Sequence, residues 1–186
     1  SHLSWLAAIS MLRSKGPDLS EFVAWGWKEP NTHIFIEYLA QYYHQRIKYI
    51  HVVRHGLDMA YSRNQKQLHN WGHLFGVQIP PSPQLLPKAS LNYWIKANEK
   101  AIASGKLHLG DRFLLVNFDE LCSARDREVK RLAEFAGMRD VNVNMKELYS
   151  IPRRPSSTGR YKQHELSIFD QGEIDAVRRL GFELDG

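Results

Sequence analysis

The chain of 186 residues is 43% hydrophobic, so it is long enough and apolar enough to bury one substantial core. No apolar stretch reaches the roughly 18 residues of a membrane span, and the first residues do not have the pattern of a signal peptide. The formal net charge of +5 favours an anionic partner, and the lone Cys122 excludes an internal disulfide and a cysteine-based metal site. We therefore expect one domain over residues 1–186 that binds a phosphate-bearing molecule, with no membrane span in this segment.

The first predicted elements are a short strand and a helix. Residues 23–27 favour β structure, and Pro30 disfavours helix in the residue before it, so Lys28 is expected at the C-terminal end of a strand. Residues 32–44 are predicted to form a helix because large side chains recur every four positions. These side chains are Ile34, Tyr38 and Tyr42.

The strongest predicted strand spans residues 47–54 and is apolar enough to be central in a sheet. Gly56 ends this strand, and residues 57–67 have a helical composition. Residues 68–88 are rich in proline and show little periodicity, which predicts a long loop. Because long loops in compact domains often serve a site, we expect Trp71 and Phe75 to help shape an acceptor pocket.

Four further elements follow. Residues 89–104 are predicted to be a helix, residues 113–118 a buried strand, and the next segment an amphipathic helix that stops at Gly137. The polar and basic segment 150–170 precedes a short final helix over residues 173–180. Strands that alternate with helices predict an α/β fold, in which helices flank a parallel sheet with right-handed crossovers.

A possible phosphate site begins at the end of the 47–54 strand. Arg54 lies at the carboxyl end of this strand, where open α/β sheets bind ligands, and Ser62 follows eight residues later. A guanidinium donates forked, charge-assisted hydrogen bonds to phosphate, a hydroxyl adds a neutral donor, and Gly56 permits a tight turn between them. The pattern therefore predicts a phosphate clamp.

This motif resembles the 3′-phosphate site of the sulfotransferase superfamily, in which a V-V-R strand end is followed by a serine eight residues beyond the arginine. Arg54 and Ser62 occupy those two positions. Residues 27–32 resemble the K-D/E-P segment of tyrosylprotein and bacterial sulfotransferases, and residues 116–121 resemble their Y-E-D/Q-L segment. Residues 154–161 resemble the C-terminal loop that closes over the cofactor. The matches occur in the family's order, and the Arg/Ser pair is the most specific of them.

The resemblance implies an α/β architecture of the P-loop nucleotide-kinase type. It implies transfer of a sulfuryl group from 3′-phosphoadenosine 5′-phosphosulfate (PAPS) to a hydroxyl of a carbohydrate, a peptide tyrosine or a small metabolite. The acceptor oxygen attacks sulfur in line, 3′,5′-ADP leaves, and no metal is required. We expect a cytoplasmic location, or a lumenal one if the chain is part of an anchored sulfotransferase.

The resemblance also assigns roles to individual residues. Lys28 would stabilise the charge that develops on the leaving oxygen, and Ser156 or Ser157 would supply a hydroxyl there. The expected cofactor-binding residues are Arg54, Ser62, Phe118, Gly159 and Arg160.

The chain also departs from the family pattern. The family's P-loop, which holds the 5′-phosphosulfate, and the general base that follows it are expected upstream of Lys28, but the first 27 residues contain no such motif. We therefore expect a domain that is incomplete at its N-terminus. His55 replaces the commoner Asp or Asn, and Phe118 lacks the hydroxyl of the matching tyrosine, which weakens an adenine contact inferred from the family.

Each assignment has a simpler alternative. Arg54 would form an ion pair with Asp58 one turn later, and Lys28 would be a surface partner of Glu29. Trp94 is interpreted as a core aromatic. His69 and His73 have the i, i+4 spacing of zinc ligands, but Gly72 interrupts the helix and no third ligand is evident.

Three other functions compete with sulfuryl transfer. A non-catalytic relative would bind a 3′-phosphonucleotide or a protein partner. A nucleotide kinase is disfavoured because no Walker lysine is present. Nucleic-acid binding is disfavoured because no base-stacking or groove-reading motif accompanies the charge.

Overall fold

The computed structural model describes residues 26–138 and 144–184, and the chain divides into two compact units, residues 1–30 and 31–186. In the first unit, residues 26–29 are exposed and have no regular secondary structure, and Pro30 lies in a turn. The predicted strand over residues 23–27 is therefore absent at Gly26 and Trp27, where glycine offers no side chain to pack. Its first three residues lie outside the described residues, and the single domain stays a prediction.

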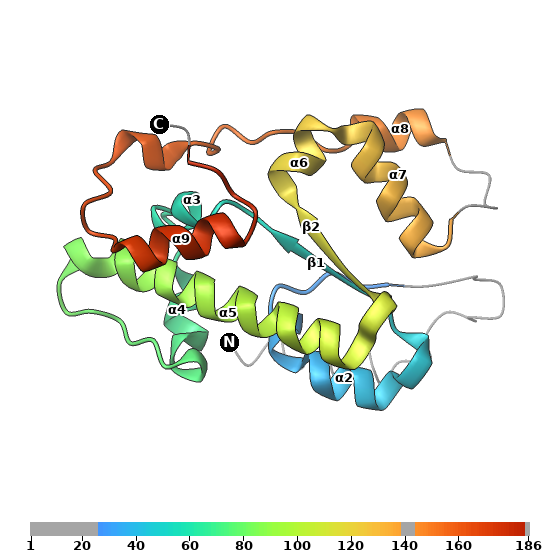
Figure 1. Ribbon diagram of the computed structural model, residues 1–186, viewed down its shortest axis with the longest axis horizontal. Coiled ribbons are helices and arrows are strands. Elements are labelled where there is room, and N and C mark those ends of the chain that lie inside the picture. The colour runs from blue at the N-terminus through green and yellow to red at the C-terminus, as the bar shows by residue number, and fades with distance from the viewer. Residues whose placement is uncertain (1–25, 139–143, 185–186) are drawn as a thin grey trace. The chain divides into compact units, whose positions relative to one another are not determined.

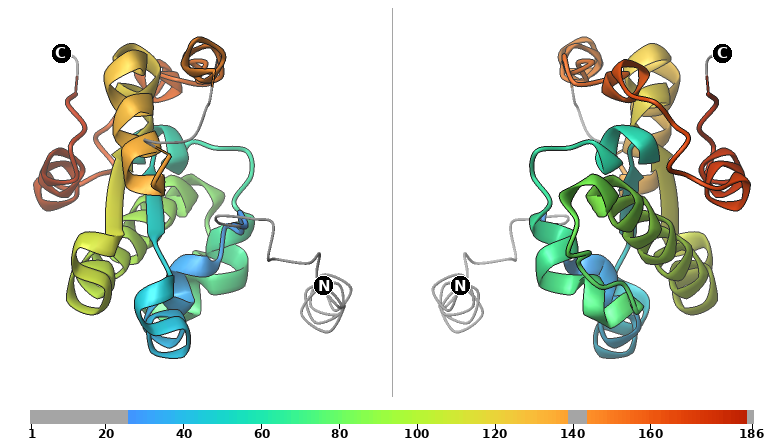
Figure 2. Two further views of the ribbon diagram at one scale, coloured as in Figure 1. Left: turned by 90° about the vertical axis from the view of Figure 1, so that its right-hand side faces the viewer. Right: turned by 90° about the vertical axis from the view of Figure 1, so that its left-hand side faces the viewer.

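The second unit has a parallel α/β arrangement, as predicted. Strands β1 (Tyr49–Val53) and β2 (Phe113–Asn117) pair in parallel, with His51 opposite Leu115. They lie side by side in Figure 1 and in the left view of Figure 2. Parallel strands need a long crossover connection, and here it contains several helices.

The longest helix, α5 (Leu86–Leu109), packs against both strands and against four other helices. These are α2 (Ile36–Tyr43), α3 (Gly56–Ala60), α4 (Lys66–Trp71) and α9 (Gln171–Arg179). The helix begins three residues earlier than predicted because Pro87 lies in its first turn, where proline is tolerated. Gly105 lets α5 approach β2 closely, since a Cβ there would lie only 2.1 Å from the Phe113 ring.

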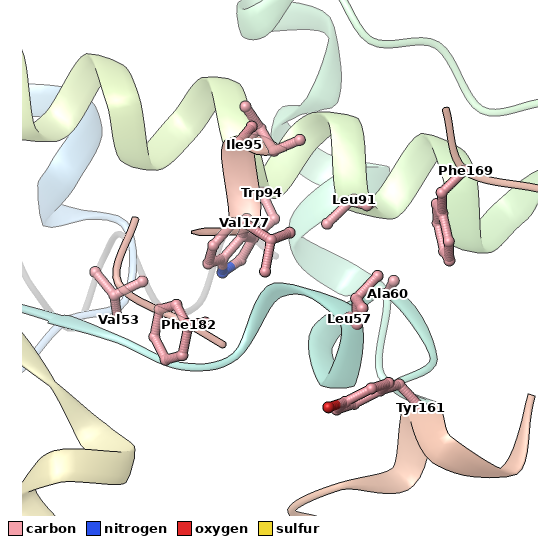
Figure 3. Close-up of a cluster of buried hydrophobic side chains, with 11 residues drawn as sticks. Val53, Leu57, Ala60, Leu91, Trp94, Ile95, Tyr161, Phe169, Val177 and Phe182 are labelled. Carbon is pink, nitrogen blue, oxygen red and sulfur yellow. The ribbon is translucent and has the colours of Figure 1, made fainter. Parts of the chain in front are cut away.

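The largest core lies between α3, α5, α9 and the C-terminal segment, whose side chains converge on one another in Figure 3. Trp94 is buried in this core, which confirms its structural interpretation. Its ring also explains Gly56, because a Cβ on that residue would lie 2.7 Å from the indole. The buried members of this core are Val53, Leu57, Ala60, Leu91, Trp94, Ile95, Tyr161, Phe169, Ala176, Val177 and Phe182.

Helix α2 forms within the predicted range, and two of the three recurring large side chains are exposed. Tyr38 and Tyr42 are 71% and 78% exposed, whereas Ile36 and Ala40 are buried with Ala101 of α5. The smaller residues allow the two helices to pack closely, while an exposed tyrosine keeps its hydroxyl in water. Short 3₁₀ turns flank the helix on both sides, at Thr32–Phe35 and His44–Arg46.

Most of residues 68–88, which were predicted to be a loop, have helical or 3₁₀ structure, and this corrects the sequence interpretation. Helix α4 (Lys66–Trp71) continues into a 3₁₀ turn at Gly72–Phe75, and another 3₁₀ turn at Pro83–Leu85 precedes α5. Leu68 and Val77 form a second core with Tyr93 and Ala97 of α5. Trp71 and Phe75 pack against this core, partly buried, and their part in an acceptor pocket stays a prediction.

The C-terminal half contains four helices among the described residues. Helices α6 (Phe118–Ser123) and α7 (Arg125–Ala136) follow β2, and Gly137 ends α7 in the left-handed conformation, as predicted. Helix α8 (Met145–Ser150) and a 3₁₀ turn at Arg160–Gln163 precede α9. Within residues 26–138 and 144–184, no helix is long and apolar enough to cross a membrane.

Candidate nucleotide site

A pocket of about 330 Å³ lies beside the carboxyl end of β1. Three of the residues predicted to bind the cofactor, Arg54, Ser62 and Arg160, line it together. Arg54 and Arg160 are more than one hundred residues apart in the chain, so folding brings the two arginines to one place. The full lining consists of Arg54, Asp58, Met59, Ser62, Asn64, Lys66, Gln67 and Arg160.

Arg54 connects the strand end to two other predicted site residues. Its Nη2 atom donates a hydrogen bond of 3.3 Å to the Ser157 hydroxyl oxygen. Its guanidinium carbon lies 5.4 Å from the centre of the Phe118 ring, within the range of a cation–π contact. Arg54, Phe118 and Ser157 are therefore neighbours. The arginine remains half-buried and lines the pocket, so its charge faces a place where a ligand fits.

Ser62 does not lie on a helix, although residues 57–67 were predicted to form one. Helix α3 ends at Ala60, Tyr61 lies in a turn, and Ser62 follows without regular secondary structure. The side-chain amide of Gln65 caps this end, since its Nε2 atom lies 2.8–3.2 Å from the carbonyl oxygens of Met59, Ala60 and Ser62, which share its two N–H donors. The Ser62 oxygen accepts the Asn64 N–H at 3.3 Å, and its O–H remains a potential donor to an anion.

The alternative role for Arg54, an ion pair with Asp58, does not occur between these two described residues. Asp58 is 4% exposed, and its two carboxylate oxygens accept the backbone N–H groups of Gly159 and Tyr161, at 2.8 and 3.2 Å. The carboxylate thus binds the C-terminal loop, and Arg54 is left to face the pocket. Sequence reasoning placed Asp58 correctly one turn after Arg54 but did not foresee this partner, which lies a hundred residues away.

The C-terminal loop over residues 154–161 reaches the pocket through Arg160. Gly159 adopts the left-handed conformation, with φ of +79°, that this loop requires. The Nε atom of Arg160 donates to the Ser157 carbonyl oxygen at 3.3 Å, which orients the guanidinium. Ser156 is exposed and, unlike Arg160, is not part of the described pocket lining.

His55 shows why a histidine fits the position where Asp or Asn is commoner. Its Nδ1 atom accepts the Leu57 N–H at 3.2 Å, so it caps α3 as an Asp or Asn side chain would. Because Nδ1 accepts, the proton lies on Nε2, which donates to the Glu183 carbonyl oxygen at 3.2 Å. The ring also stacks on Tyr161, with centroids 4.6 Å apart. The imidazole thus binds both the loop and the C-terminal segment.

Lys28 lies in the first unit, where it is exposed, and its catalytic role stays a prediction.

His69 and His73 lie on α4 and on the 3₁₀ turn after it, and both are exposed. Among the described residues no group of three or more His, Cys, Asp or Glu side chains is close enough to hold a metal ion.

The structure adds four polar or charged residues to the pocket that sequence reasoning did not select. Asn64, Lys66 and Gln67 follow Ser62 closely, and Asp58 precedes it. Lys66 lies only four residues beyond Ser62, but nothing in its local sequence distinguishes it from a surface lysine. Its contribution matters for charge, because the lining then carries three cations and one carboxylate.

Comparison with known proteins identifies one family. A sequence model described as the sulfotransferase family matches residues 4–142, which is most of the chain. The match includes both strands and Arg54, and it ends before the C-terminal loop that carries Arg160. Searches of curated proteins and of solved structures gave no match.

Proposed function

Because this chain belongs to the sulfotransferase family, we propose that it transfers a sulfuryl group from PAPS to a hydroxyl acceptor by in-line displacement. The acceptor belongs to one of three classes: carbohydrate, peptide tyrosine or small metabolite. The observation that carries the proposal is the convergence of Arg54, Ser62 and Arg160 on one pocket.

The charge of this pocket supports a phosphate ligand. Arg54, Lys66 and Arg160 provide three positive charges and Asp58 one negative charge, so the lining has an excess of two positive charges. A phosphomonoester carries a charge near −2 at neutral pH, and forked guanidinium donors suit its oxygens. The volume of about 330 Å³ also leaves room for more than a phosphate group. The donor set therefore fits the 3′-phosphate and part of the nucleoside to which it is attached.

The proposed division of labour separates binding from chemistry. PAPS supplies the sulfuryl group and leaves as 3′,5′-ADP. Arg54, Ser62 and Arg160 hold the 3′-phosphate, and the ring of Phe118 keeps Arg54 in place by its cation–π contact. Of the two candidate serines, Ser157 contacts Arg54. We therefore favour Ser157 over Ser156 as the hydroxyl donor to the leaving oxygen. Lys28, by its resemblance to the family lysine, would stabilise the departing oxygen.

Nucleotide titration calorimetry tests the binding half of the proposal. The wild-type chain should prefer 3′,5′-ADP to 5′-ADP, which has the same number of phosphates in a different place. Arg54→Ala should weaken 3′,5′-ADP binding by about 1.5 to 3 kcal/mol, the value of a hydrogen bond to a charged group, and remove most of the preference. Arg63→Ala is the matched control, because Arg63 is exposed and outside the described lining. Equal binding of the two nucleotides, or unchanged affinity in Arg54→Ala, would contradict the proposal.

Transfer itself is tested by supplying PAPS with acceptors of each class and measuring 3′,5′-ADP release together with the sulfated product. Release that depends on an acceptor supports an enzyme. Selective 3′,5′-ADP binding without transfer to any acceptor would favour the non-catalytic alternative.

A further inference from the structure

Asp58 is an unexpected component of a pocket for an anion. It is a buried carboxylate on α3, and it lines the same pocket as the two arginines. By charge alone, a carboxylate beside a phosphate disfavours binding. Its presence therefore calls for a structural reason, which its hydrogen bonds supply.

Both oxygens of Asp58 bind the C-terminal loop. Oδ2 accepts the Gly159 N–H at 2.8 Å and Oδ1 accepts the Tyr161 N–H at 3.2 Å. The left-handed backbone of Gly159, with φ of +79°, accompanies the approach of both N–H groups to one carboxylate. The residue between them is Arg160, whose side chain lines the pocket. The two hydrogen bonds thus fix the backbone on both sides of a predicted phosphate-binding arginine.

A second contact strengthens the same attachment. Tyr161, which is 4% exposed, stacks on His55 at the start of α3. Arg54, directly before His55, donates to the Ser157 hydroxyl. The segment from Arg54 to Asp58 therefore contacts the loop through a hydrogen bond to a side chain, a ring stack and a carboxylate.

We infer that Asp58 is a positioning residue for the cofactor: it holds the C-terminal loop against α3 so that Arg160 is in place before the nucleotide binds. The inference rests on the proposed nucleotide function. Asp58 would thus raise the affinity for an anionic ligand although it is itself negatively charged. Holding a cation at the phosphate outweighs the repulsion from one carboxylate whose two oxygens already accept hydrogen bonds.

The variant Asp58→Asn distinguishes charge repulsion from loop positioning, because the two predict opposite changes in 3′,5′-ADP affinity. Asparagine keeps the size of the side chain, but it removes the negative charge and offers an N–H₂ group to a backbone N–H. A purely electrostatic role predicts tighter 3′,5′-ADP binding in this variant. The positioning role predicts binding weaker by about tenfold or more, the equivalent of about one hydrogen bond to a charged group. Asp111→Asn, at an exposed acid outside the described lining, should bind as the wild type does.

A double-mutant cycle shows whether Asp58 acts through Arg160. In the wild-type background, Arg160→Ala should weaken 3′,5′-ADP binding by about tenfold or more. In the Asp58→Asn background the same change should cost less than about twofold, because the arginine is no longer held in place. Additive losses would overturn the inference. If Arg54→Ala lowers affinity while Asp58→Asn binds as tightly as the wild type, or more tightly, the nucleotide site stands and the positioning role fails.

Limited trypsin digestion gives a readout that needs no ligand. Cleavage after the half-buried Arg160 should be faster in Asp58→Asn than in the wild type, relative to cleavage after the exposed Arg153 in the same chain. An unchanged ratio would contradict the loop attachment. If Asp58→Asn does not fold, Gly159→Ala tests the attachment from the loop side, since alanine is strained at this positive φ. This variant should also lose affinity and expose Arg160 to trypsin, and wild-type behaviour in both assays would overturn the inference.

Discussion

The stability of the fold should fall on mild acidification because of one buried histidine. His51 on β1 is 8% exposed, and its ring has two partners. The Nε2 atom lies 2.8 Å from Asn98 Oδ1, so it carries the proton, and the Nδ1 atom, 3.2 Å from the Tyr49 hydroxyl, accepts one. Both positions of the neutral ring are thus used, and a second proton on Nδ1 would require the Tyr49 hydroxyl to accept instead of donate.

The size of the effect follows from the pKa of His51. Burial lowers this pKa from 6.5 to about 4, while the hydrogen bond to Asn98 opposes the shift and the neighbouring His33 adds to it. The unfolded state therefore binds more protons than the folded state between these two values, and stability is lost as the pH falls through this window. Since each pKa unit corresponds to about 1.4 kcal/mol, the full loss is about 3 kcal/mol, of which about 2 kcal/mol appears between pH 7 and pH 5.

Urea unfolding at pH 7, 6 and 5 measures this loss, with His51→Gln as the perturbation. Glutamine retains an N–H donor for Asn98 and does not titrate in this range. The carboxylates and the other histidines are common to both proteins, so the difference between their unfolding free energies isolates His51. That difference should change by about 2 kcal/mol from pH 7 to pH 5. His69→Gln, at an exposed histidine, is the control. Parallel pH profiles for the wild type and His51→Gln would refute the reasoning.

Three other predictions concern catalysis, packing and reactivity. Lys28→Met should lower turnover with PAPS at least tenfold, equivalent to about 1.4 kcal/mol, with little change in 3′,5′-ADP affinity; a smaller loss would remove Lys28 from the catalytic assignments. Gly105→Ala should destabilise the chain by about 1 to 3 kcal/mol because of the close Phe113 ring, whereas Gly172→Ala on α9 should be neutral or stabilise slightly by helix propensity; thermal unfolding compares them, and equal effects would contradict the packing argument. Burial raises the pKa of the Cys122 thiol, so a maleimide should label it more slowly in the folded chain than in urea, and equal rates would show that the thiol is exposed.

The fold class could be predicted because the two strands carry continuous apolar runs that no helix period explains. The proximity of Arg54 and Ser62, which line one pocket, was also predictable, since the two residues are close in sequence. The buried face of α2 could not be predicted, because the spacing of Tyr38 and Tyr42 identifies a helix but does not say which residues its neighbour buries. Only the tertiary contact with α5 decides that.

The partner of Asp58 and the protonation state of His51 were beyond sequence reasoning for a related physical reason. Both depend on groups more than forty residues away, Gly159 and Tyr161 in one case and Asn98 in the other. A local pattern gives the chemistry of a side chain but not its distant partner. The helical structure within residues 68–88 was missed for the same reason, because Leu68 and Val77 become core residues only when α5 packs beside them.

The C-terminal segment couples nucleotide binding to local opening of the core. Val177 and Phe182 complete the main core, and Arg160 completes the pocket, so one stretch of chain serves both. Partial detachment of this stretch would open the pocket and the core together as one cooperative unit. Bound nucleotide should therefore slow amide hydrogen exchange in α9, although that helix contributes no residue to the described pocket lining.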